Sequence, residues 1–183
     1  MRNKPLTVHA TQATLEIIQA HIFNWAIWPD FSEIPNRDKP FMRYAETRVG
    51  KAVKVEGREM TPLPANHTVP AVGYRIDSGE GSLVFSGDTS VCDELWKAVN
   101  KIRNLRYLII ETAFSNRERQ LAIASKHLCP DMLKGELLKL QREAEIYITH
   151  LKPGQIELTM QEIEEFIGEY KPRMLQNNQV FDL

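Results

Sequence analysis

The sequence lacks an excess of charge of either sign. Its 183 residues carry 23 Lys and Arg against 24 Asp and Glu, which gives a formal net charge of −1. A chain with so little net charge has no overall field that would attract nucleic acid or an anionic membrane. We therefore expect neither as a partner, and we expect any anionic ligand to be held by a local site.

Cysteine and long apolar runs are also scarce. The two cysteines, Cys92 and Cys129, lie far apart, so they do not form a disulfide framework and they fit a reducing cytoplasm. The N-terminus has no apolar segment typical of a signal peptide, and the most apolar stretch, residues 21–28, is interrupted by Asn24 and closed by Pro29. These features predict a soluble cytoplasmic protein.

The chain has none of the compact metal-binding motifs H-x-H, H-E-x-x-H or C-x-x-C. It has instead three polar residues next to apolar runs of strand length: His67 in NHTVPAVGYRI, Asp88 in LVFSGDTS and His150 in IYITHLKPG. A single sheet could bring these side chains to one edge, which makes them a candidate metal site. Three residues are too few for a two-metal centre, because each ion needs roughly three to five donors.

Two of the three candidates, Asp88 and His150, also have a purely structural interpretation. Gly87 would let the chain turn sharply, so that Asp88 projects from the carboxyl end of the sheet, where ligands gather in α/β folds. Asp88 or Thr89 could equally cap a following helix. His150 could be a structural histidine at the end of a buried strand.

The expected elements change in type along the chain, which we read as one domain of residues 1–183. Periodicity predicts a helix over 11–22, an aromatic loop over 23–41, strands over 41–55 broken near Gly50, and a hairpin of strands 69–77 and 82–86. The second half alternates helices with short strands, at 91–102, 107–110, 130–142, 146–149 and 159–170. This alternation predicts an α/β fold with a β-α-β-α-β layer of parallel strands.

Two further residues have a possible catalytic role. His127 precedes Cys129 and Pro130, and proline at a first helical position signals a helix N-terminus, where a phosphoryl group could be bound. Without other evidence, a surface-loop histidine is the favoured interpretation of His127. Glu111, at the end of YLIIET, could orient a ligating histidine or cap the next segment.

The ordered set NHTVPAVGYRI, LVFSGDTS, IIETAFSN, SKHLCPDML and ITHLKPG resembles the C-terminal motifs of the metallo-β-lactamase superfamily. It is most similar to the class II 3′,5′-cyclic-nucleotide phosphodiesterases, and HLCP with THLKPG separates it from ribonuclease Z. The resemblance implies a four-layer αββα sandwich with an incomplete N-terminal portion, two divalent metal ions such as zinc, and hydrolysis of cyclic AMP or cyclic GMP. It also implies that His67, Asp88 and His150 bind metal, and that His127 contacts the scissile phosphate.

The family's H-x-H-x-D-H motif, expected ahead of the aromatic segment, does not occur in this sequence. Either the chain is part of a longer protein or it is a natural short form. With three of the seven implied protein ligands, we expect the chain alone to hold zinc weakly and to be inactive. The alternatives are a ribonuclease Z-like nuclease and a metal-free remnant that serves as a binding or assembly module.

A shortened first sheet would leave an unpaired strand edge, which favours pairing with a second copy. We therefore expect a homodimer, with the β-rich residues 41–77 and the loop that carries Trp25 and Trp28 at its interface.

Overall fold

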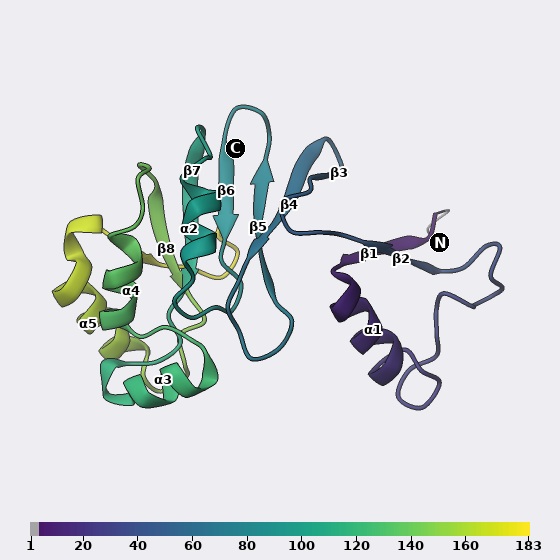
Figure 1. Ribbon diagram of the computed structural model, residues 1–183, viewed down its shortest axis with the longest axis horizontal. Coiled ribbons are helices and arrows are strands. Elements are labelled where there is room, and N and C mark those ends of the chain that lie inside the picture. The colour runs from purple at the N-terminus through teal and green to yellow at the C-terminus, as the bar shows by residue number, and fades with distance from the viewer. Residues whose placement is uncertain (1–3) are drawn as a thin grey trace. The chain divides into compact units, whose positions relative to one another are not determined.

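The structure is a computed structural model that describes residues 4–183, and the chain divides into two compact units, residues 1–51 and 52–183. In the first unit, strand β1 (Leu6–Ala10) pairs in parallel with β2 (Met42–Glu46), and helix α1 (Gln12–His21) follows β1 directly (Figure 1). The N-cap Thr11 accepts a hydrogen bond from the backbone N of Thr14, at 3.4 Å, as expected for a helix start.

The predictions for this unit are confirmed for the helix and for the aromatic loop, since residues 22–41 contain neither helix nor strand. Strand β1 was not predicted. It includes His9, and His21 ends α1, so both histidines belong to the secondary structure of the first unit.

The second unit is built on one seven-stranded mixed sheet with the order β3-β4-β5-β6-β7-β8-β9. Its strands are β3 (Val53–Val55), β4 (Arg58–Pro64), β5 (Val72–Asp77), β6 (Ser82–Phe85), β7 (Leu105–Glu111), β8 (Glu145–Thr149) and β9 (Arg173–Met174). The pairings from β3 to β6 are antiparallel, and those from β6 to β9 are parallel. The predicted hairpin of β5 and β6 and the predicted parallel layer are therefore confirmed.

Four α-helices connect or follow the parallel strands: α2 (Asp93–Val99), α3 (Arg119–Ser125), α4 (Pro130–Leu137) and α5 (Ile156–Ile167). Short 3-10 turns lie at Asn116–Glu118 and Gly168–Tyr170. The predicted bounds need correction at three helices. Helix α2 ends at Val99 rather than Ile102, α4 ends at Leu137 rather than near Arg142, and α5 begins at Ile156 rather than Thr159. The apolar residue Leu140 extended the helical pattern beyond α4, although it packs against the core from a turn.

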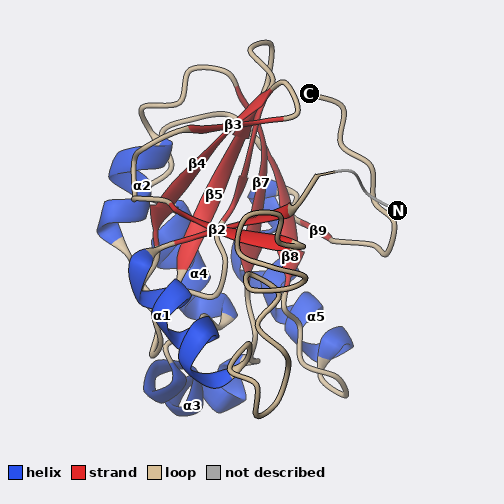
Figure 2. Cartoon of the chain, turned by 90° about the vertical axis from the view of Figure 1, so that its right-hand side faces the viewer, coloured by secondary structure: helices blue, strands red, loops and turns tan. Residues whose placement is uncertain are grey.

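The main core lies between the sheet and helices α2, α4 and α5, which cover one of its faces (Figures 1 and 2). The fully buried side chains Leu108, Ile110, Ile146 and Ile148 alternate along β7 and β8 toward these helices. Burying this face fixes the strand register, since a shift by one residue would turn its apolar side chains to the other side.

The opposite face of the sheet carries a smaller cluster around the buried Leu83, Ile109 and Tyr147. The C-terminal segment covers part of it, because Phe181 packs edge-on against Tyr147 with 4.9 Å between the ring centroids. The sequence left open whether the C-terminal segment packs against the rest of the chain. Phe181 does so, whereas Val180 stays 77% exposed.

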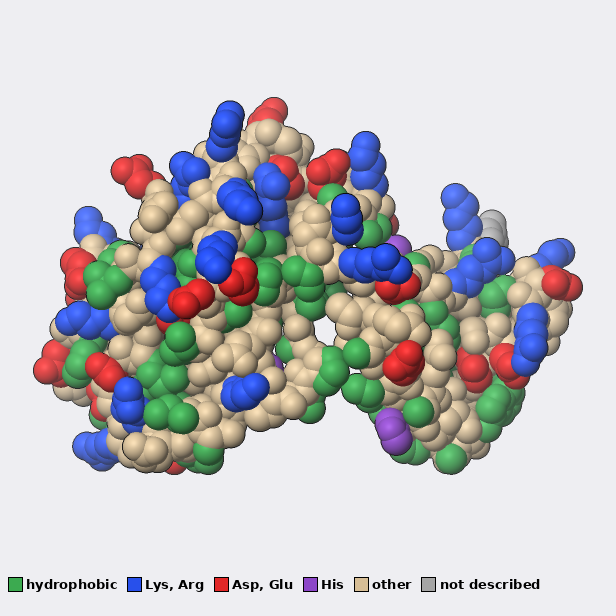
Figure 3. Space-filling model, in the orientation of Figure 1, with side chains coloured by type: hydrophobic (Ala, Val, Ile, Leu, Met, Phe, Trp, Pro, Cys, Tyr) green, Lys and Arg blue, Asp and Glu red, His purple; other side chains and the backbone are tan. Residues whose placement is uncertain are grey.

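Charged side chains of both signs are interspersed over the face of the molecule drawn in Figure 3, in line with the balanced composition. Among residues 4–183, no helix is long and apolar enough to cross a membrane.

Candidate metal centre

Strand directions explain why residues far apart in the sequence meet at one edge of the large sheet. Strands β4 and β6 are both antiparallel to β5, so they run in the same direction, and β7 and β8 are parallel to β6. The carboxyl ends of these four strands therefore lie at the same edge. His67 follows β4, Asp88 follows β6 and His150 follows β8 directly. The sequence predicted the strands before Asp88 and His150, whereas β4 was not predicted.

The turn before Asp88 requires glycine. Gly87 has a φ of +63°, and a Cβ added to it would lie 2.7 Å from the backbone O of Val72. Only glycine fits this left-handed conformation and this close approach of two backbones. The turn projects Asp88 from the sheet edge. The helix-cap interpretation of Asp88 and Thr89 is wrong, because α2 begins at Asp93 with Cys92 at its N-cap.

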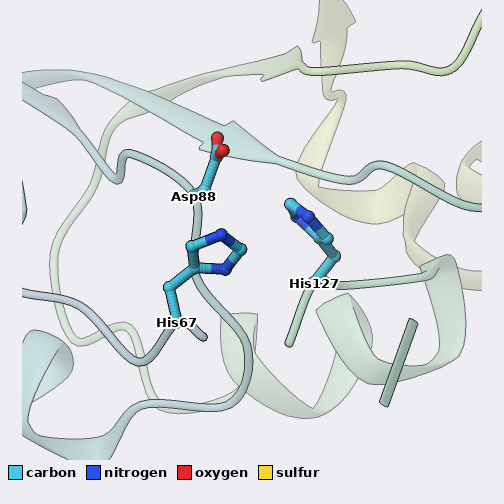
Figure 4. Close-up of side chains that lie close together, drawn as sticks. All are labelled: His67, Asp88 and His127. Atoms are coloured by element: carbon cyan, nitrogen blue, oxygen red, sulfur yellow. The ribbon is translucent and has the colours of Figure 1, made fainter. Parts of the chain in front are cut away.

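The candidate side chains converge on one small volume. One ligand atom each from His67, Asp88 and His127 lies within 4.8 Å of the other two, and Figure 4 shows the three side chains facing a common space. His150 belongs to the same cluster, since its Nδ1 lies 3.1 Å from Oδ1 of Asp88 and its ring stacks on that of His127 with 5.0 Å between centroids. The structure thus brings together all four residues singled out from the sequence.

Glu111 lies beneath this cluster and organises it. Its fully buried carboxylate accepts hydrogen bonds from the backbone N of Thr89, Ala113 and Leu128, at 3.0–3.2 Å. Its Oε1 lies 2.7 Å from Nδ1 of His127. Glu111 therefore holds the backbone of neighbouring segments, as one of its two considered roles requires, and it contacts His127, which is not one of the three predicted metal ligands.

Burial also changes the acid–base properties of this pair. It raises the pKa of Glu111 to about 7, against the opposing effect of the hydrogen bonds from Leu128 and Thr89. Burial is also the largest cause that lowers the pKa of His127, followed by the charge of His67. Only 8% of His127 is exposed, so its interpretation as a surface-loop histidine is wrong.

The ring of His67 is fixed by a residue that the sequence analysis did not select. Its Nδ1 lies 3.1 Å from the backbone O of Lys126, and Nζ of Lys126 donates to the backbone O of His67 at 3.4 Å. Lys126 ends α3 in a left-handed conformation with a φ of 56°, and His150 has a φ of 65°. Such strain in non-glycine residues clusters at functional sites. No sequence pattern marks Lys126 for this role, because its backbone makes the contact.

The donor set fits a divalent metal ion. Nδ1 of His67 donates to the backbone O of Lys126, since a carbonyl oxygen can only accept, which leaves Nε2 of His67 as the free nitrogen. A tetrahedral ion with bonds of about 2.1 Å holds its donors roughly 3.4 Å apart. The ligand atoms of His67, Asp88 and His127 lie at most 4.8 Å apart, so no separation exceeds this requirement by more than about 1.4 Å.

Comparison with known families agrees with this geometry. The model of the β-lactamase superfamily domain matches residues 1–168. The chain belongs to the metallo-β-lactamase superfamily. Its mixed sheet with helices on one face is the α/β arrangement found in solved members of this superfamily, so the predicted fold class is confirmed. The family is metal-dependent, in keeping with a His and Asp cluster at the sheet edge.

Among curated proteins, the chain is 24% identical over 174 residues to a probable 3′,5′-cyclic-nucleotide phosphodiesterase of Yersinia pestis, a match that covers 81% of the chain and 50% of that protein. The structure of unliganded yeast PDE1 superposes with a TM-score of 0.79 at 18% identity, covering 97% of this chain and 60% of the yeast chain. Human tRNase Z, short form, superposes with a TM-score of 0.57 at 14% identity, over 84% of this chain and 62% of the human one. The chain thus spans between half and two thirds of the length of these relatives.

Proposed function

We propose that this chain provides the C-terminal part of a metal-dependent phosphodiesterase that hydrolyses 3′,5′-cyclic nucleotides such as cyclic AMP and cyclic GMP. The convergence of His67, Asp88, His127 and His150 at one sheet edge is the observation that carries the proposal. The choice of substrate is supported by the printed name of the curated relative.

In this proposal, His67, Asp88 and His150 hold metal, with the Asp88 carboxylate placed between the other two. Divalent ions, when bound, supply the Lewis acidity that activates water and polarises a phosphoryl oxygen. Asp88 suits a shared position because it lies 3.1 Å from His150 and also belongs to the donor group with His67.

His127 acts on the substrate in this proposal. Its ring lies between those of His67 and His150 at centroid distances of 4.8 and 5.0 Å, beside the space where a phosphoryl group would sit. Protonated at Nε2, it donates a hydrogen bond or a proton to the phosphoryl oxygen that develops charge. Glu111, at 2.7 Å from Nδ1, orients the ring and stabilises the imidazolium that the reaction requires.

A ribonuclease of the tRNase Z type is the second candidate from the same superfamily. Likeness in fold alone supports it here, and the formal net charge of −1 opposes it, because polyanion binding relies on basic surface.

The test compares this chain with a version extended by a segment that carries H-x-H-x-D-H, each assayed with cyclic AMP, cyclic GMP and precursor tRNA in the presence of zinc or manganese. We expect hydrolysis of a cyclic nucleotide by the extended version, and background turnover by the chain alone. In the extended version, His127→Ala should lower turnover by about 100-fold and leave metal content nearly unchanged. Asp88→Ala should reduce both. Cleavage of precursor tRNA without hydrolysis of cyclic nucleotides would contradict the proposal.

A further inference from the structure

A lysine lies at the wall of the candidate metal centre. Lys152 comes two residues after His150, and its backbone N donates a hydrogen bond to the backbone O of Ala113 at 3.3 Å. Ala113 in turn donates to Glu111, the carboxylate beneath the cluster. The backbone of Lys152 is therefore tied to the same framework that holds His127.

The side chain of Lys152 lies over an aromatic ring. Its Nζ lies 5.3 Å from the ring centroid of Phe114, within the range of a cation–π interaction. The Phe114 ring is 8% exposed and meets the His127 ring edge-on, with 5.8 Å between centroids. One buried ring thus contacts both the lysine and the proposed substrate-binding histidine.

Lys152 has no acidic partner in the second unit. None of the ion pairs within residues 52–183 involves it. A half-buried lysine without a carboxylate partner is suited to receive an anion.

The carboxylates at this sheet edge explain why substrate binding would require a cation. A phosphodiester that approaches His127 brings its negative charge close to Asp88 and to Glu111, and like charges repel at this range. We propose that Lys152 binds a non-bridging oxygen of the substrate phosphoryl group and so selects anionic phosphodiesters over neutral esters. This inference rests on the proposed phosphodiesterase function and adds a residue that recognises its substrate.

The test is a titration of the chain with inorganic phosphate, and separately with cyclic AMP, at low ionic strength, followed through the imidazole signals of His127 by NMR. Lys152→Met keeps the apolar stem over Phe114 and removes the charge, whereas Lys152→Arg keeps the charge. Lys134→Met is the matched control, because Nζ of Lys134 lies 5.9 Å from the ring centroid of Phe166, in a similar cation–π contact.

We expect Lys152→Met to weaken phosphate and cyclic AMP binding about tenfold, the loss of one charge-assisted hydrogen bond. Lys152→Arg should stay within about threefold of the natural chain, and Lys134→Met should bind as the natural chain does. Unchanged phosphate binding in Lys152→Met, or no binding by the natural chain, would overturn the inference. Far-ultraviolet circular dichroism of each variant would show that the fold is retained.

Failure of this inference is distinguishable from failure of the proposed function. If Lys152→Met loses phosphate affinity but the extended protein does not hydrolyse cyclic nucleotides, the anion-binding role stands and the proposed function falls. If the extended protein hydrolyses cyclic AMP and Lys152→Met binds phosphate as well as the natural chain, the lysine inference falls alone.

Discussion

Replacing Gly87 by alanine should both destabilise the second unit and displace Asp88. The new Cβ would lie 2.7 Å from the backbone O of Val72, a separation that two backbones can relieve only by moving apart. The left-handed conformation, with a φ of +63°, costs a non-glycine residue about 1–2 kcal/mol, and the overlap adds about 1–3 kcal/mol. The expected loss in the free energy of unfolding is therefore about 2–5 kcal/mol.

Gly154→Ala is the matched control for this variant. Gly154 also has a positive φ, of +83°, but no atom lies within 4 Å of an added Cβ. Its replacement should cost only the conformational part, about 1–2 kcal/mol. The two losses therefore differ by the steric contact at Gly87.

Urea unfolding followed by the fluorescence of Trp96, which is 2% exposed, measures both losses. The NMR signals of His150 report whether its contact with Asp88 is kept, and Gly87→Ala should shift them while Gly154→Ala does not. Equal losses in the two variants would refute the argument that the close approach of Gly87 to the neighbouring strand fixes the position of Asp88.

Three further predictions concern the pH dependence, the strained backbone and the association of the chain. Burial raises the pKa of Glu111 to about 7, so protonation of this side chain favours the folded state. The stability that Glu111 contributes is fully present below about pH 4.5 and is lost as the pH rises through 7. In urea titrations with EDTA, the natural chain should lose about 3 kcal/mol relative to the non-titrating Glu111→Gln between pH 4.5 and 8. A constant difference between the two would contradict this. Lys126→Gly should raise the free energy of unfolding by about 1 kcal/mol, because glycine adopts a φ of 56° without strain. A lower urea midpoint would show that the Lys126 side chain stabilises the fold by more than its strained backbone destabilises it. Light scattering over a dilution series should show a dimer. The double variant Trp25→Ser and Trp28→Ser should weaken this dimer, since the two side chains are 61% and 56% exposed. A monomer mass at all concentrations would refute self-association.

Much of the architecture could be predicted because the second half of the chain has strong local patterns. The apolar runs of β7 and β8 are short and buried on both faces, and the helices between them carry regular apolar stripes. Glycine before Asp88 and the position of His150 at a strand end also indicated the correct edge of the sheet. These patterns depend on neighbouring residues only, so a single sequence is sufficient to detect them.

Strand β4 was missed because Pro62 and Pro64 interrupt its pattern. Strand β4 tolerates proline at these positions because its neighbour β3 pairs only with residues 58–60. Pro62 and Pro64 lie beyond the end of the β3–β4 pairing, where no backbone N–H is needed as a donor to β3. Tertiary pairing with β5 thus overrides the local signal.

The contacts that complete the site could not be predicted, because they join residues through the fold. Glu111 and His127 are 16 residues apart, and Lys126 acts on His67 through its backbone O across 59 residues. The distance of Lys152 from the buried Phe114 ring likewise follows from the packing of two loops. Residue types could suggest these roles, but only the fold brings the partners together.

The central claim is that the sheet edge of the second unit binds a divalent metal ion through its histidines. The chain has five histidines, and two of them, His9 and His21, lie in the first unit and serve as internal controls. The most direct measurement is an NMR titration of the imidazole signals with Mn²⁺, which broadens signals from nearby nuclei, followed by Zn²⁺. The account predicts broadening at His67, His127 and His150 at concentrations that leave His9 and His21 sharp, and loss of this selectivity in Asp88→Ala. Equal broadening of all five histidines, or no response of the three at the sheet edge, would contradict it.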